Sequence, residues 1–201
     1  DVLGGQVRVE RVVVDAENFA RENQRYYEEF ASGRLNIHEF AAFSMAPLVK
    51  HGHEKLAALR PRFLAEKIEP VIAPGAEALI ERHRAQGDEL MILTATSRFI
   101  TEPIAARLNV QVLLATEPER VNGIYTGRIF GTPCFREGKL TRLREYLNVR
   151  QPHITFYSDS RNDLPLLEAV QTPVAVDPDD LLWAEASNRA CTIIVLRLSL
   201  D

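Results

Sequence analysis

The sequence is poor in cysteine. Its 201 residues contain only two, Cys134 and Cys191, and neither lies in Cys-x-x-Cys spacing or beside further cysteines and histidines. This pattern excludes a disulfide framework and gives no indication of a zinc site. We therefore expect a protein of a reducing compartment and assign it to the cytoplasm.

The sequence also lacks long apolar runs and blocks of like charge. No uninterrupted apolar run approaches the ~18 residues that a bilayer-spanning helix needs. The 24 lysines and arginines nearly balance the 28 aspartates and glutamates, which leaves a net charge of −4 and no polybasic arm. We therefore expect neither nucleic acid nor a membrane as a partner. The oligomeric state stays open.

The N-terminal third has a helical pattern. From Asp15, placed as an N-cap, apolar residues recur at helical spacing until Gly33, which predicts a first helix. A second helix is expected from Asn36 to near Pro47, and a third towards Pro70. Together they predict a small helical bundle.

After this bundle, helices alternate with short apolar strands. Strands are expected at 90–93, 110–115, 154–157, 174–176 and 192–196, and helices at 76–86, 102–108, 138–147, 164–170 and 181–190. Asn122-Gly123 predicts a hairpin over 119–130. The alternation predicts an α/β fold with a Rossmann-like, doubly wound parallel sheet and a small helical-bundle cap. We expect the cap region over 1–72 and the core over 73–201.

Polar residues follow two of the predicted strands. One strand is followed by the hydroxyl-rich turn Thr94-Ala95-Thr96-Ser97 and another by the segment from Ser158 to Asp163. Ligands of open parallel sheets bind beyond the carboxyl ends of the strands. Asp159 and Asp163, at the start of a helix, can bracket a hard cation such as Mg²⁺. Together with Lys139 near another helix start, they offer the hydrogen bonds and charge that a phosphate dianion needs.

These residues resemble the haloacid dehalogenase (HAD) superfamily. Thr94 after an apolar strand, the pair Gly138-Lys139, and the run from Asp159 to Asp163 followed by Leu-Pro-Leu-Leu are similar to its motifs two, three and four. The branch that the chain resembles is subfamily IB, the phosphoserine-phosphatase-like hydrolases, whose small helical cap is inserted after motif one. The resemblance covers nearly the whole chain.

The resemblance implies a role for each matched residue. Thr94 and the backbone N–H of Ala95 would hold the phosphoryl oxygens, and Lys139 would neutralise the charge of the phosphate and of the nucleophile. Asp159 would ligate Mg²⁺, and Asp163 would orient the metal shell or the lysine.

Asn162 would contact the phosphate or the substrate. The implied protein is a HAD-type phosphatase, an Mg²⁺-dependent phosphomonoester hydrolase that acts on a small phosphorylated metabolite through an aspartyl-phosphate intermediate. The competing hypothesis is a catalytically silent protein of the same fold that binds phosphorylated ligands or a partner.

The nucleophile motif of the family, Asp-x-Asp-x-Thr, does not occur between Asp1 and Asp15. We therefore expect the sequence to begin just past this motif and the chain as given to be inactive. A missing central strand would leave unpaired backbone groups. We therefore expect either that another segment fills its place, with residues 7–14 the leading candidate, or that a gap remains there. Asp15 itself, after three valines, is the alternative nucleophile, although its reading as an N-cap is favoured.

Three further residues could suggest other sites. His51 and His53 form a His-Gly-His sequence, but without further ligands they predict solvent-exposed side chains rather than a metal site. Cys134 has no basic partner nearby in the sequence and is expected to be a small buried residue rather than a nucleophile.

Overall fold

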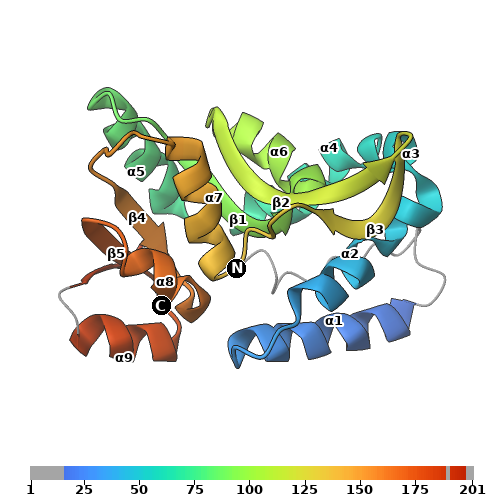
Figure 1. Ribbon diagram of the computed structural model, residues 1–201, viewed down its shortest axis with the longest axis horizontal. Helices are drawn as coiled ribbons and strands as arrows, with labels where there is room; N and C mark the ends of the chain where they lie inside the picture. The colour runs from blue at the N-terminus through green and yellow to red at the C-terminus, as the bar shows by residue number, and fades with distance from the viewer. Residues whose placement is uncertain (1–15, 189–190, 198–201) are drawn as a thin grey trace.

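The computed structural model describes residues 16–188 and 191–197. Within them the strands form two three-stranded sheets, in the orders β1-β2-β3 and β4-β5-β6 (Figure 1). The strands are β1 (Met91–Ser97), β2 (Val112–Val121), β3 (Ile124–Phe130), β4 (Thr155–Ser158), β5 (Thr172–Val176) and β6 (Thr192–Ile194). The helices are α1 (Ala16–Ala31), α2 (Ile37–His51), α3 (His53–Ala57), α4 (Arg60–Phe63), α5 (Pro74–Ala85), α6 (Arg98–Arg107), α7 (Glu137–Leu147), α8 (Leu164–Leu167) and α9 (Asp180–Asn188).

Three of the four strand pairs among the described residues are parallel. β1 runs parallel to β2, with Met91 opposite Val112, and β5 lies between β4 and β6 with both pairs parallel. At Asn122-Gly123 the chain turns from β2 into the antiparallel β3, which is the predicted hairpin. Figure 1 shows α7 in front of β1 and α6 behind β2. The predicted α/β class with parallel strands is confirmed.

Strands β1 and β4 do not pair with each other in the described part of the chain. Direct pairing between them would have contradicted the expectation that a further strand lies between them. Residues 7–14, the candidate for that place, and the alternative nucleophile Asp15 lie outside the described residues. Both expectations therefore stay predictions.

The first two helices pack through aromatic side chains. Tyr26 of α1 contacts Phe40 and Phe43 of α2, with ring centroids 5.5 and 5.0 Å apart, and Phe19 stacks on Phe43 at 4.7 Å. Such tilted and edge-on contacts add stability beyond the area they bury. α1 ends before Gly33, as predicted, because this glycine adopts a left-handed conformation with φ +72°.

Helix α2 continues through Pro47, so the prediction that it ends near this proline is wrong. A proline removes one helical hydrogen bond, and burial of the apolar face of α2 offsets that loss. Met45 and Leu48 are buried in a cluster that includes Tyr125 of β3. The helix ends instead at Gly52, whose N–H donates to the Leu48 carbonyl. Figure 1 shows α2 between α1 and the β2–β3 hairpin.

The expected third helix of the cap region is broken into short pieces. α3 and α4 are followed by a π-helical turn (Leu64–Ile68) and a 3-10 turn (Glu69–Val71). Pro61 lies in the first turn of α4 and Pro70 in the 3-10 turn. Proline cannot donate a backbone hydrogen bond. Each of these two prolines therefore interrupts the helical hydrogen bonding, and a new short helical segment begins there.

Helix α6 begins at Arg98, earlier than predicted, so Pro103 lies inside the helix and not in its first turn. This proline leaves the Phe99 carbonyl without its helical donor. The guanidinium of Arg60 supplies a replacement, with Nη1 donating to that carbonyl at 3.4 Å. A tertiary contact therefore makes the internal proline tolerable.

The other boundaries differ from the predictions by a few residues. β2 is one continuous strand where two separate segments were expected, because its first half pairs with β1 and its second half with β3. α8 is shorter than predicted and β5 starts earlier. In the described ranges, no helix combines the length and apolarity needed to cross a bilayer.

The N-cap of α2 gives a first testable prediction. Asn36 Oδ1 accepts from the N–H groups of His38 at 3.1 Å and Glu39 at 3.4 Å. We expect Asn36→Ala to lower the free energy of unfolding by about 1 kcal/mol, because both N–H groups lose their acceptor. Asn36→Ser keeps a capping oxygen in a Ser-x-x-Glu box and should stay within about 0.5 kcal/mol of wild type. Chemical denaturation measures both, and equal losses would contradict the capping role.

Candidate active site

A buried ion pair links α7 to the carboxyl end of β4. Lys139 Nζ donates to Asp163 Oδ2 at 2.6 Å, and the two side chains are only 10% and 9% exposed. Ser158 Oγ donates to the same carboxylate oxygen at 2.8 Å. Because buried charges are stable only when they are paired and hydrogen-bonded, these contacts fix all three side chains. Two of the predicted site residues are therefore in direct contact.

The start of α7 fixes the position of Lys139. Gly138 lies so close to the Pro133 carbonyl oxygen that a Cβ at this position would overlap with that oxygen. The N–H of Gly138 donates to the Phe135 carbonyl at 2.9 Å, and the N–H of Lys139 donates to the Arg136 carbonyl at 3.0 Å. The predicted Gly-Lys pair thus has a steric cause, since only glycine lets the helix begin this close to the preceding turn.

The segment after β4 is held by its own hydroxyl groups. Ser158 Oγ accepts from the N–H of Ser160 at 3.1 Å, and Ser160 Oγ accepts from the N–H of Asn162 at 3.2 Å. The Asp159 carbonyl accepts from the N–H of Asp179 at 3.1 Å, which ties the segment to the residue before α9. Asp159 is half-buried in this arrangement.

The predicted hydroxyl-rich turn is a bulge inside β1. Pairing with β2 passes from Thr94 opposite Ala115 to Ser97 opposite Thr116, so three steps on β1 match one step on β2. Thr94 Oγ1 accepts from the N–H of Thr96 at 3.1 Å and stabilises the irregular backbone. A bulge at a strand end commonly redirects side chains towards a site.

Cys134 lies between this bulge and α7. It is fully buried, its N–H donates to Thr116 Oγ1 at 3.2 Å, and its thiol donates to the Leu114 carbonyl at 3.2 Å. Burial raises the pKa of the thiol to about 11, opposed by the positive charge of Lys139 and a hydrogen bond to the Thr94 backbone. The prediction that Cys134 is a small buried residue is confirmed. Its contacts bring Thr94 and Lys139 to the same part of the molecule.

The C-terminal end of α1 lies against the segment that carries Asn162. Asn162 Nδ2 donates to the Phe30 carbonyl at 3.0 Å. Ala95, in the bulge of β1, packs against the cluster formed by Tyr26, Leu35 and Phe135. The N-terminal helices therefore cover the part of the molecule where the predicted site residues gather.

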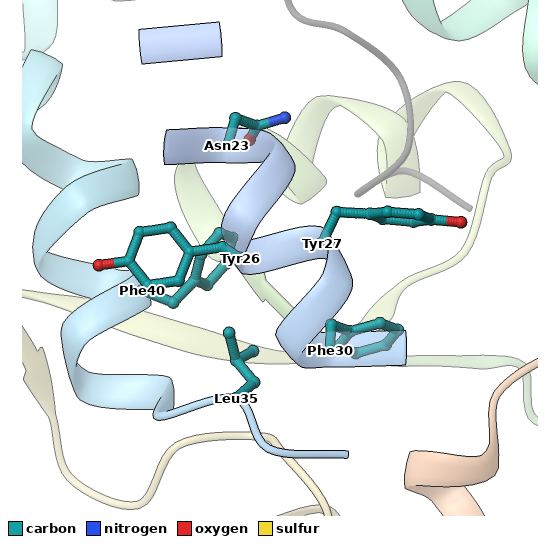
Figure 2. Close-up of a pocket in the computed structure, with 6 residues that line it drawn as sticks. All are labelled: Asn23, Tyr26, Tyr27, Phe30, Leu35 and Phe40. Atoms are coloured by element: carbon teal, nitrogen blue, oxygen red, sulfur yellow. The ribbon is translucent and has the colours of Figure 1, made fainter. Parts of the chain in front are cut away.

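A small pocket opens on α1 beside this contact. Figure 2 shows Asn23, Tyr27 and Phe30 along one face of α1, while Tyr26 turns towards α2. The lining residues are Asn23, Tyr26, Tyr27, Phe30, Leu35 and Phe40. The pocket offers aromatic surface and one amide group next to the helix end that reaches Asn162.

The histidine prediction is wrong in part, because both His51 and His53 are half-buried rather than solvent-exposed. His53 Nδ1 lies 2.9 Å from the Tyr125 hydroxyl, and its ring packs edge-on against Phe99 with centroids 5.4 Å apart. The ring fills the space between α3, α6 and the hairpin, which explains its burial.

The donor chemistry of the site fits Mg²⁺. This ion prefers oxygen ligands and is commonly held by one or two carboxylates together with water and substrate phosphate. Asp159 and Asp163 supply two carboxylates on one segment, although the described residues contain no group of three or more metal-ligating side chains. Asp163 Oδ2 accepts from both Lys139 and Ser158, and Asp159 follows β4 directly with a half-buried side chain, so both carboxylates lie where a cation could be held.

Sequence analysis gave no role to two residues that the structure places at the site. Ser158 lies in the polar segment after β4, and its position at the strand end is the signal that could have marked it. Arg136 contacts Asn162 and the Gly33 carbonyl, 26 and 103 positions away. No local pattern in the sequence could have indicated these contacts.

Comparison with known proteins decides the family. The model of the haloacid dehalogenase-like hydrolases matches residues 6–168. The chain belongs to this family. The predicted HAD resemblance is thereby confirmed, as is the enzyme class of a HAD-type phosphatase, which the names of its relatives support.

Several of the named relatives are phosphatases. A histidinol-phosphatase of Neisseria meningitidis serogroup C is 36% identical over 196 residues, which cover 94% of this chain and 88% of the relative. The phosphoserine phosphatase SerB1 of Mycobacterium tuberculosis is 35% identical over 207 residues, which cover 99% of this chain and 61% of the relative. The chain thus spans less than two thirds of the mycobacterial protein.

Solved structures share the fold. A protein of unknown function from Bordetella pertussis Tohama I superposes with a TM-score of 0.85 at 38% identity, covering 93% of this chain and 86% of that one. A phospho-aspartyl intermediate analogue of phosphoserine phosphatase superposes with a TM-score of 0.67 at 16% identity, covering 90% and 82%. At this low identity the second similarity concerns the fold alone.

The close approach at Gly138 gives a second prediction. Alanine normally favours a helix over glycine by roughly 0.5–1 kcal/mol. We expect Gly138→Ala to destabilise the protein by about 1–3 kcal/mol instead, because the added Cβ meets the Pro133 carbonyl oxygen. Thr141→Ala, on the exposed side of the same helix, is the control and should change stability by less than about 0.5 kcal/mol. Thermal and chemical unfolding measure both, and a stabilising Gly138→Ala would contradict the steric argument.

The raised pKa of Cys134 gives a third prediction. Above pH 9 the thiol ionises in the unfolded chain, whereas in the folded protein it stays protonated up to its pKa of about 11. The folded state is therefore disfavoured as the pH rises through this window, by up to about 1.4 kcal/mol per pH unit. We expect Cys134→Ala to lose less stability than wild type between pH 9 and pH 11. Urea denaturation measures the free energy of unfolding of both proteins at each pH. If this free energy falls equally steeply with pH in wild type and variant, the thiol does not contribute to the pH dependence.

Proposed function

We propose that the protein is an Mg²⁺-dependent phosphomonoester hydrolase that acts on a small phosphorylated metabolite through an aspartyl-phosphate intermediate. The observation that carries the proposal is the buried group formed by Lys139, Asp163 and Ser158 beneath the N-terminal helices. A fixed positive charge at the carboxyl end of a sheet is suited to a phosphate dianion. Membership of a hydrolase family supports the same reaction class.

Phosphoryl transfer depends mainly on positioning and charge stabilisation, and the proposed roles follow from this. Thr94 and the backbone N–H of Ala95 hold the phosphoryl oxygens. Lys139 neutralises charge on the transferred group, and Asp163 holds the ammonium in place through its 2.6 Å contact. Asn162 contacts the phosphate or the substrate.

The reaction needs a carboxylate nucleophile, which the family carries in an Asp-x-Asp-x-Thr motif. This nucleophile is not assigned to any described residue. Mg²⁺, when bound, supplies positive charge beside the phosphate. Asp159 would be its direct ligand and Asp163 would orient the surrounding shell.

The proposal also divides the chain into a cap region over 1–72 and a Rossmann-like core over 73–201. The contacts of α1 and of the α1–α2 cluster with Asn162 and Ala95 support a cap that encloses the substrate. The names of the relatives make histidinol phosphate and phosphoserine the first substrates to test. A cytoplasmic location belongs to the same proposal.

The fourth prediction tests this function in the full-length protein. We expect release of inorganic phosphate from histidinol phosphate, phosphoserine or an aryl phosphate in the presence of Mg²⁺, and loss of that release with EDTA. Lys139→Met and Asp163→Asn should each lower kcat by about 100-fold or more, because each removes charge stabilisation at the site. Lys67→Met, at an exposed lysine, is the matched control and should leave kcat unchanged.

Each site variant also leaves one buried group without its partner and can therefore destabilise the fold. Melting temperatures of all variants show whether a loss of activity occurs in a folded protein. A folded wild-type protein that binds the phosphate esters but releases no phosphate from them would overturn the hydrolase and favour the silent binding protein. A folded Lys139→Met variant with wild-type kcat would remove Lys139 from the mechanism.

A further inference from the structure

Arg136 connects the core to the end of α1. Its Nε donates to Asn162 Oδ1 at 3.2 Å, its Nη2 donates to the Gly33 carbonyl, and its guanidinium lies 5.0 Å from the centre of the Phe135 ring. One side chain thus contacts both the segment after β4 and the turn that follows α1. None of the roles proposed above uses this arginine.

Asn162 completes the connection from the other side. Its Oδ1 accepts from Arg136, and its Nδ2 donates to the Phe30 carbonyl at 3.0 Å. A third, longer contact joins Nδ2 to Ser160 Oγ at 3.4 Å. The amide is therefore oriented by three neighbours, with the oxygen towards the arginine and the NH₂ group towards α1 and Ser160. Asn162 is 8% exposed, so the amide is buried, and its contacts with Arg136 and Phe30 are partly buried.

The end of α1 is a favourable place for these donors. The last carbonyls of a helix have no partners within the helix and carry partial negative charge. The last turn of α1 contains no basic residue of its own. Arg136 and Asn162 instead supply a cation and an amide donor from the core, to the carbonyls of Gly33 and Phe30.

The backbone of Arg136 is in an unfavourable conformation for a residue with a side chain. Its φ of +48° and ψ of −123° lie in a region that favours glycine. Such strain persists where the surrounding contacts hold it, and it concentrates at functional sites. The same residue is the N-cap of α7, and its carbonyl accepts from the N–H of Lys139 at 3.0 Å.

We propose that Arg136 is a positioning residue that couples the place of α1 to the orientation of Asn162. The inference rests on the proposed phosphatase site, because it concerns how the cap encloses that site. With Oδ1 held by Arg136, the NH₂ group of Asn162 points towards the Phe30 carbonyl when α1 is docked. If α1 moves away, the NH₂ group loses the Phe30 carbonyl and keeps only its contact with Ser160 Oγ, so one N–H becomes available to the substrate while Oδ1 stays bonded to the arginine.

The experiment compares three substitutions of Arg136 in the full-length protein with the exposed control Arg144→Gln on α7. Arg136→Gln removes the charge and should raise KM about tenfold with a smaller change in kcat, because Lys139 and Asp163 stay in place. Arg136→Lys keeps one cationic donor and should recover part of the loss. The control should keep wild-type kinetics.

Hydrogen exchange supplies a readout that does not need activity. The amides of residues 32–35 are bonded to the last carbonyls of α1, and we expect them to exchange about tenfold faster in Arg136→Gln than in wild type. Exchange in α9 should not change. If residues 32–35 exchange equally in Arg136→Gln and Arg144→Gln, the coupling is wrong even if the protein is a phosphatase.

Arg136→Gly separates positioning from plain stability. Glycine relieves the backbone conformation, so this variant should melt at or above the temperature of Arg136→Gln, yet show the same faster exchange and raised KM. Recovery of wild-type KM and exchange in Arg136→Gly would show a merely structural role and overturn the proposal. A wild-type protein that hydrolyses no phosphate ester would refute the proposed function, whereas the exchange comparison would still decide the coupling.

Discussion

The contact between the Lys139 ammonium and the Asp163 carboxylate ties the start of α7 to the segment after β4, 24 positions further along the chain. Both groups are buried, so the free energy of folding depends on their meeting, and removal of one partner typically costs about 3–5 kcal/mol. The start of α7, the end of β4 and the short turn before α8 must all be placed for the 2.6 Å contact to form. The glycine at 138 and the serine at 158 act in support of this pair.

Much of the architecture follows from local sequence patterns. The alternation of helices and strands, the Asn122-Gly123 turn and the helix stop at Gly33 could be predicted because each depends on neighbouring residues. The approach of Lys139 to Asp163 could be anticipated from the rule that polar residues gather at the carboxyl ends of parallel strands. The internal prolines could not, because the Arg60 side chain that compensates for Pro103 comes from a distant helix.

The same limit applies to the site. The packing of His53 on Tyr125 and the contacts of Arg136 join residues that are far apart in the chain. Such contacts leave no periodic signal, so sequence reasoning could anticipate that Lys139 and Asp163 lie together but missed the contacts that join the core to the N-terminal helices. The roles of the former remain proposals, whereas the family is established by comparison.

Strand β2 is shared between two kinds of neighbour. Its first half runs beside β1, and its second half forms the hairpin on which α2 packs through Met45, Leu48 and Tyr125. Helix α2 is thereby anchored to the same strand that borders the bulge at Thr94, whereas α1 reaches Asn162 through the Phe30 carbonyl and the turn after it reaches Arg136 through the Gly33 carbonyl. The two helices therefore meet the core in different ways, α2 through a buried apolar face and α1 through polar backbone groups near its C-terminal end.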